Sequence, residues 1–182
     1  MYIADQTKAP EGAEIVGQSV ADWVDNLNKG LTDPVFEKYG LSEIDPEGWY
    51  SLDIIIDLYR GMAESEGGSA SLVAMGKASA KPVYDIFEFK SFEDFIKNGD
   101  KPFKAAIRNI PDEYGLSTEK VGERHYRIVN NSIVPNDMIY GYLWEMFRII
   151  PHTWEDYSFI PVSGYSPGST ERAVFEIKEE TE

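Results

Sequence analysis

Apolar side chains recur every three or four positions along the N-terminal half of the chain, and this spacing predicts amphipathic helices. A first helix carries its apolar face at Val16, Val20, Trp23, Val24 and Leu27, and Gly30 is a plausible stop. A short second helix is predicted over 32–39. A third follows over 52–62, with Ser51 as its N-cap.

Glycine, serine and proline residues mark the predicted helix boundaries in the next part of the chain. Gly67 and Gly68 end the helix before them, and Ser69 is expected to cap a long helix over 70–87. Pro82 should bend or break that helix. Its small residues Ala70, Ala74 and Ala78 share one face, which would let another backbone approach closely. Two shorter helices are expected next, one with Ser91 as its N-cap and one from Lys101 through Ile107.

The pattern changes after Pro111. The alternation over 123–129 predicts a strand, with Tyr126 and Ile128 on one of its faces. An amphipathic helix is predicted over 135–150, and two strands over 159–162 and 173–178. The fold class is therefore α+β: an N-terminal helical part packed against a small antiparallel sheet with a crossing helix.

Length and composition indicate one folded unit. The chain has 182 residues with 42% apolar content, which is enough for a sizeable core. Residues 1–14 are polar and contain Pro10 and Gly12, so we expect a flexible N-terminal arm, followed by a single folded domain over 15–182.

The chain is strongly acidic, with a formal net charge of -15, which disfavours nucleic acid and anionic membranes as partners. It contains no cysteine, so disulfides, thiolate catalysis and cysteine-ligated metals are excluded. Neither a membrane-spanning apolar stretch nor a secretory signal is evident, and we expect a cytoplasmic protein without membrane insertion. The two histidines, His125 and His152, are isolated, so no metal site is predicted.

One motif matches a hydrolase signature by its letters. Gly164-Tyr165-Ser166-Pro167-Gly168 reads G-x-S-x-G, which in hydrolases lies between a strand and a helix and is followed by a histidine. Here a strand follows and both histidines come earlier. A hairpin turn is the better interpretation, and no catalytic residue is predicted.

The segment from Phe92 to Tyr142 carries a family resemblance. It contains Phe92-Glu93-Asp94-Phe95-Ile96, Asp100-Lys101-Pro102-Phe103, His125-Tyr126-Arg127-Ile128-Val129-Asn130 and Tyr140-Gly141-Tyr142-Leu143. This order resembles the haem-nitric-oxide-binding (H-NOX) sensor fold and its 4-vinyl-reductase relatives. In the haem-binding members, F-x-x-F-L leads to D-x-x-H, whose histidine ligates the iron, and a Y-x-S-x-R strand holds the haem propionates.

The resemblance implies that haem chemistry is lost here. Phe103 occupies the position of the histidine, and phenylalanine has no lone pair to give to iron. Tyr126 is retained, but Ile128 and Asn130 replace the serine and the arginine. No cofactor is therefore expected, and the resemblance implies an apolar ligand pocket lined by Phe92, Phe95, Phe103, Tyr126, Ile128 and Tyr142.

The helix over 135–150 is apolar around much of its circumference. Such a helix is either buried on two sides or lies at a subunit interface. Tyr140, Trp144 and Phe147 are the candidate interface residues, and a homodimer is the expected assembly.

Three functional hypotheses remain at this stage. The leading one is a haem-free, non-enzymatic sensor or binding module that binds a small hydrophobic molecule and signals through a protein partner. The second is a structural or assembly subunit that kept the fold without a ligand. The third is an enzyme or carrier acting on a tetrapyrrole-like molecule.

Overall fold

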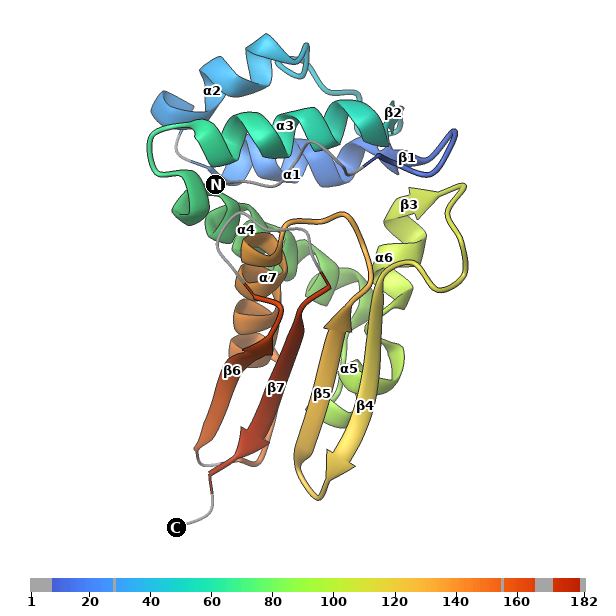
Figure 1. Ribbon diagram of the computed structural model, residues 1–182, viewed down its shortest axis with the longest axis vertical. Helices are drawn as coiled ribbons and strands as arrows, with labels where there is room; N and C mark the ends of the chain where they lie inside the picture. The colour runs from blue at the N-terminus through green and yellow to red at the C-terminus, as the bar shows by residue number, and fades with distance from the viewer. Residues whose placement is uncertain (1–7, 28, 155, 166–171, 181–182) are drawn as a thin grey trace.

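The N-terminal helices form one end of the molecule and a four-stranded sheet forms the other (Figure 1). The computed structural model describes residues 8–27, 29–154, 156–165 and 172–180. The α+β class predicted from the sequence is confirmed.

The N-terminal end combines three helices with a small sheet. The helices are α1 (Gly17–Asn26), α2 (Lys29–Lys38) and α3 (Leu52–Glu64). The sheet has the order β2-β1-β3 and consists of β1 (Glu14–Val16), β2 (Trp49–Ser51) and β3 (Ile107–Arg108). Ser51 caps α3 as predicted, because its hydroxyl accepts a hydrogen bond from the Asp53 amide.

Three further helices lead from this end to the main sheet: α4 (Gly68–Phe87), α5 (Phe92–Asn98) and α6 (Lys101–Ala106). The main sheet is antiparallel, with the order β4-β5-β7-β6. It consists of β4 (Leu116–Gly122), β5 (His125–Asn130), β6 (Tyr157–Ser163) and β7 (Val174–Glu179). Helix α7 (Asn136–Ile149) joins β5 to β6 and makes the most extensive helix contact in the described structure, with α4.

Three helix boundaries differ from the prediction. Gly30 lies inside α2 rather than after α1, and Gly67 rather than Ser69 is the N-cap of α4. The N-cap position has φ +96° at Gly67. Glycine adopts this backbone conformation without strain, whereas serine would not. Pro82 lies within α4 without ending it. Proline removes one helix hydrogen bond, and packing of α4 along α7 outweighs that loss.

The small sheet corrects the expected N-terminal arm. Ala13 is buried, and Glu14 begins β1. The Glu14 carboxylate accepts a hydrogen bond from the Arg108 guanidinium at 2.6 Å, which joins β1 to β3. Strands of two or three residues are too short to show an alternating pattern, so neither the sheet nor this pairing was predicted. Residues 1–7 of the arm lie outside the described part of the chain.

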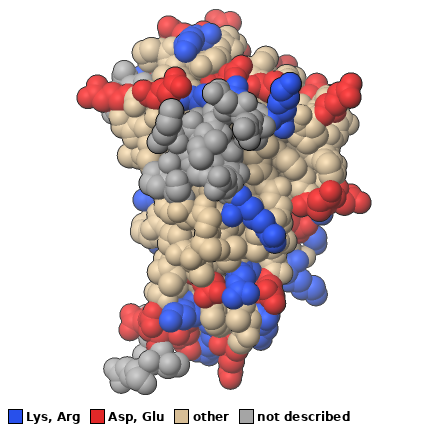
Figure 2. All heavy atoms as spheres, viewed as in Figure 1, with Lys and Arg blue, Asp and Glu red and all other residues tan. Residues whose placement is uncertain are grey.

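Acidic side chains are unevenly distributed over the face that Figure 2 shows. On this face Asp and Glu gather mainly at the helical end and at the far end of the sheet, and the described atoms between them are mostly uncharged, with a few Lys and Arg side chains. Within the described residues, none of the helices is long and apolar enough to cross a membrane.

Candidate functional site

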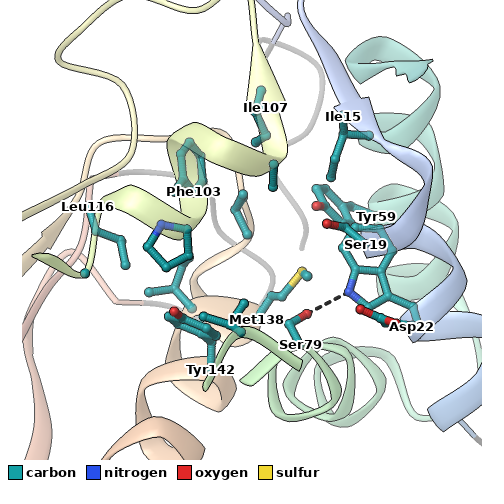
Figure 3. A pocket seen from close by; sticks show the side chains of 17 residues that line it. Ile15, Ser19, Asp22, Tyr59, Ser79, Phe103, Ile107, Leu116, Met138 and Tyr142 are labelled. Carbon is teal, nitrogen blue, oxygen red and sulfur yellow. Dashed lines mark hydrogen bonds between the residues drawn. The ribbon is translucent and has the colours of Figure 1, made fainter. Parts of the chain in front are cut away.

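A cavity of about 120 Å³ lies where the N-terminal helices meet α6 and α7 (Figure 3). Its lining is mostly apolar, with a few hydroxyl groups and one carboxylate. Cavities of this size accept single-ring molecules, since an engineered apolar cavity of about 150 Å³ binds benzene.

One wall of the cavity comes from β1, the N-terminal helices and α4. It contains Ile15, Ser19, Asp22, Trp23, Tyr59, Ser79 and Val83. The Trp23 indole nitrogen donates a hydrogen bond to the Ser79 hydroxyl at 2.7 Å, which ties α1 to α4 at the edge of the cavity (Figure 3). The Trp23 and Tyr59 rings lie next to each other, with centroids 5.9 Å apart.

The opposite wall comes from the segment that runs from the end of α5 to the first residue of β4. It contains Gly99, Pro102, Phe103, Ala106, Ile107 and Leu116. Val134, Met138, Ile139 and Tyr142, from α7 and the loop before it, complete the lining. Figure 3 shows Phe103 and Leu116 on the side away from Ser19 and Tyr59. The cavity thus has one wall with polar groups and one that is apolar.

The two hydroxyls of Ser19 and Tyr142 have no hydrogen-bond partner among the described residues, and both residues line the cavity. Burial raises the pKa of the Tyr142 hydroxyl above its ordinary value, so it stays protonated at neutral pH and can donate to a ligand. The Asp22 carboxylate accepts a hydrogen bond from the Gln18 amide at 2.8 Å. It is the one charged side chain among the described residues of the lining.

Phe103 lies at the cavity wall, at the position where the resemblance expects a histidine. Its ring packs against Tyr114, with centroids 5.7 Å apart, and against the backbone at Gly115. Gly115 has φ +126°, and a Cβ there would lie 3.0 Å from the Phe103 ring. This glycine therefore leaves room for the aromatic side chain beside the cavity.

Two of the six expected pocket residues, Phe103 and Tyr142, line the cavity, and four do not. Phe92 and Phe95 are fully buried in an aromatic cluster between α5 and α7. The Phe92 ring lies 5.3 Å from Phe147 and 5.0 Å from Trp154, measured between centroids. Their large rings fill the space between the helices, so they contribute packing rather than a cavity wall.

Tyr126 and Ile128 also lie away from the cavity, on the face of β5 that packs on the core. Ile128 is fully buried. The Tyr126 hydroxyl donates a hydrogen bond to the Glu93 carboxylate at 3.2 Å. Burial, together with the charge of Glu93, raises the pKa of Tyr126 to about 12. This tyrosine therefore faces a carboxylate of the protein itself.

Asn130, at the position of the propionate-binding arginine, is fully buried and hydrogen-bonded within its own loop. Its side-chain nitrogen donates to the Val134 carbonyl and to the Asn136 side chain, both at 3.0 Å. Its side-chain oxygen accepts from the Ser132 amide at 3.0 Å and hydroxyl at 2.7 Å. These bonds shape the turn from β5 into α7 and occupy its hydrogen-bonding groups.

The three expected interface residues have different surroundings. Phe147 is fully buried, with Phe92, Phe95 and Phe159 around it, so its assignment to an interface is corrected to the core. Tyr140 is half-buried and stacks on Phe159. Trp144 is 39% exposed, and the Lys77 ammonium lies 4.1 Å from the centre of its ring.

The wall formed by α1, α3 and α4 was not predicted from the sequence. Ser19, Asp22 and Trp23 lie three and four positions apart, which places them on one helical face. Polar residues mixed into an otherwise apolar face were the available signal. Ser19, Asp22 and Trp23 meet Phe103 at the cavity only because separate helices pack against each other. The spacing of apolar residues within one helix does not specify this packing.

The remaining candidate motifs do not form a second site. His125 lies 3.0 Å from the Glu176 carboxylate on β7, and His152 stacks on Phe92 at 4.4 Å between ring centroids. Within the described ranges, no three His, Asp or Glu side chains gather as a metal site requires. Of the G-x-S-x-G turn, residues 166–168 lie outside the described part of the chain.

The fold matches that of solved H-NOX domains. One structure, from work on haem distortion in the H-NOX family, has a TM-score of 0.65 and 16% identity, covering 91% of this chain and 93% of that chain. An oxygen-binding H-NOX domain related to soluble guanylate cyclases has a TM-score of 0.60 and 14% identity, covering 91% and 93%. A mutant H-NOX domain of T. tengcongensis has a TM-score of 0.57 and 16% identity, covering 91% and 95%.

The chain therefore has the H-NOX fold. No family model matches it, and no curated protein matches its sequence. At 14–16% identity, these likenesses establish the fold and leave the function to be argued from the site itself.

The residues of this site do not fit a haem. Phe103 offers no lone pair to iron, and neither histidine lines the cavity. Pockets for larger ligands usually enclose about 300–1,000 Å³, well above the 120 Å³ found here. The described lining has no basic residue for propionates and contains the negative Asp22.

Proposed function

We propose that this chain is a haem-free sensor or binding module that binds a small hydrophobic molecule and passes the occupancy of its site to a protein partner. The observation that carries the proposal is the mostly apolar cavity of about 120 Å³ with Phe103 in its wall. Hydrophobic lining with a few polar groups is the usual composition of a small-molecule site.

The position of the cavity supports a sensing role. Its walls come from α1 and α3 on one side and from α6 and α7 on the other. A bound molecule would therefore contact both ends of the structure. A ligand shifts the equilibrium between two conformations only if it binds one of them more tightly than the other. A molecule bound between the two ends of the structure would have different affinities for conformations in which these ends are arranged differently.

The partner surface is proposed on the outer side of α7. Trp144 is the exposed aromatic residue there, and Tyr140 lies one helical turn before it. Aromatic side chains are favoured anchors at interfaces. A second copy of the chain is the proposed partner at this surface, since two-fold homodimers are the commonest assemblies.

The cavity favours this proposal over the assembly-subunit alternative. A subunit that kept only the fold would be expected to fill its core, since empty volume weakens a fold. Here the apolar volume is kept beside Phe103, and two hydroxyls line it without partners among the described residues.

Native mass spectrometry of the purified protein tests the proposal, because it detects retained ligand and subunit number together. Phe103→Trp should fill the cavity and remove the bound mass, while overpacking costs only about 1–3 kcal/mol of stability. Phe87→Trp is the matched control, since Phe87 is also half-buried but lies outside the cavity lining. Equal ligand retention by both variants would contradict the proposal.

A further inference from the structure

We infer that the ligand of this cavity is a small uncharged carbonyl compound of the size of a cyclic ketone, whose oxygen accepts a hydrogen bond from the Tyr142 hydroxyl. The inference rests on the proposed function and names the class of molecule that the site selects. It is carried by the polar groups of the lining, by the apolar side of the cavity and by the cavity volume.

Most of the polar side chains in the lining already have partners within the protein. The described lining side chains with hydrogen-bonding groups are Ser19, Asp22, Trp23, Tyr59, Ser79 and Tyr142. The Ser79 hydroxyl accepts a hydrogen bond from the Trp23 indole at 2.7 Å and donates one at 3.0 Å to a carbonyl of its own helix. Asp22 and Tyr59 are also engaged in interactions within the protein. Among the described residues, the hydroxyls of Ser19 and Tyr142 are left to bind a ligand.

The Tyr142 hydroxyl is a buried donor. Burial raises its pKa above the ordinary value, so it keeps its proton at neutral pH. A buried hydroxyl without a partner costs free energy, because it has given up its hydrogen bonds to water. A ligand oxygen that accepts from Tyr142 would replace those bonds. A carbonyl oxygen is suited to this role, since it is a hydrogen-bond acceptor that carries no proton.

Tyr142 lies on the apolar side of the cavity. Figure 3 shows it on the same side as Phe103 and Leu116, away from Ser19. The other hydrogen-bonding side chains of the described lining come from α1, α3 and α4. An alcohol would bring a donor of its own to this side, where the described apolar side chains offer it no acceptor. A ketone brings only an acceptor, which matches a single donor.

Charge and volume limit the ligand further. The described lining contains no basic side chain, so a carboxylate or phosphate would be buried without a counter-charge. A cation would leave the Tyr142 proton without an acceptor. The volume of about 120 Å³ is near that of a cavity that accommodates benzene, which limits the ligand to about one ring. Cyclohexanone has this size and a single carbonyl oxygen, and it is therefore a suitable probe.

The test compares cyclohexanone with methylenecyclohexane, in which a CH₂ group replaces the carbonyl oxygen. Titration of the full chain, followed by nuclear magnetic resonance, gives both dissociation constants. Tyr142→Phe should weaken cyclohexanone binding about tenfold, because the buried carbonyl loses its donor, and should leave methylenecyclohexane unchanged. Tyr126→Phe is the matched control, since it removes a tyrosine hydroxyl that lies outside the cavity lining. It should bind both probes as wild type does.

Thermal unfolding without a probe separates ligand recognition from a structural role. The Tyr142 hydroxyl has no hydrogen-bond partner among the described residues, so Tyr142→Phe should unfold at the wild-type temperature or above it. Tyr126→Phe should unfold at a lower temperature, because its hydrogen bond to Glu93 is lost. A lower unfolding temperature for Tyr142→Phe would show that this hydroxyl serves the fold, and would overturn the inference.

The binding outcomes separate this inference from the proposed function. If Tyr142→Phe binds cyclohexanone as tightly as wild type, the carbonyl class is wrong, while the site remains a binding site for small apolar molecules. Tighter binding of cyclohexanol than of cyclohexanone by wild type also overturns the carbonyl class. If neither cyclohexanone nor methylenecyclohexane binds, the inference is again overturned, and the mass spectrometry of Phe103→Trp decides the proposed function.

Discussion

Gly76 of α4 and Gly141 of α7 lie face to face where these helices cross. A Cβ on Gly76 would be 1.9 Å from the Met138 carbonyl oxygen, and one on Gly141 would be 2.1 Å from the Val73 carbonyl oxygen. Each glycine thus admits the backbone of the opposite helix. This contact brings Met138 and Tyr142 to the cavity on one side and Ser79 and Val83 on the other.

Gly141→Ala should destabilise the protein by about 3 kcal/mol, because the added methyl group meets backbone atoms that cannot move aside cheaply. Urea unfolding followed by circular dichroism measures the loss. Gly122→Ala is the control, since a Cβ there would meet its nearest atom at 3.6 Å and should change stability by less than about 1 kcal/mol. Similar losses in both variants would contradict the close crossing of the helices.

The purified protein should not bind haem at one per chain, and neither should Phe103→His. The substitution supplies a nitrogen ligand but leaves the small cavity, the negative Asp22 and the fully engaged Asn130 unchanged. Absorption spectra after haem addition and gel filtration check this. An intense Soret band at one haem per wild-type chain would refute the haem-free proposal.

Trp144→Glu should convert a dimer into folded monomers, because it places a charge within the proposed interface. Trp49→Glu is the control for this variant. Like Trp144, Trp49 is partly exposed, at 37%, and has a cation over its ring, the Arg108 guanidinium at 4.1 Å. The control should leave the dimer intact. Added salt should tighten association by screening the net charge of -15. Sedimentation that shows only monomer at every salt concentration would end this proposal.

Glu176 should make the fold sensitive to acid. Burial opposes its ionisation, but hydrogen bonds from His125 and Arg127 outweigh burial and hold its pKa below the ordinary 4.5. Ionised Glu176 therefore stabilises the fold above about pH 4.5, and this contribution is lost as the pH falls through the folded pKa. Glu176→Gln should lose less stability than wild type between neutral pH and acid, measured by urea unfolding.

Glu123→Gln serves as the control for this titration, since Glu123 is exposed beside the β4–β5 turn. It should follow the wild-type pH dependence. A Glu176→Gln variant with the full wild-type loss in acid would show that other carboxylates carry the effect.

Local signals in the sequence predicted much of the secondary structure. Ser51 and Ser91 were identified as N-caps, and their hydroxyls accept hydrogen bonds from the Asp53 and Asp94 amides. The α+β class followed from the change of period after Pro111, and the order of motifs over 92–142 indicated the H-NOX fold. Capping and periodicity act over a few residues, so they can be read from the chain.

The tertiary structure alone decided which faces meet. Phe147 and Trp144 belong to the same apolar helix, yet one is fully buried and the other 39% exposed, because α4 and the sheet cover only part of α7. The strands β1 to β3 exist through pairing between distant segments. The cavity joins Asp22 and Trp23 to Phe103 across about eighty positions of sequence. Such long-range convergence depends on helix crossings like that of Gly76 and Gly141, whose partners no local pattern specifies.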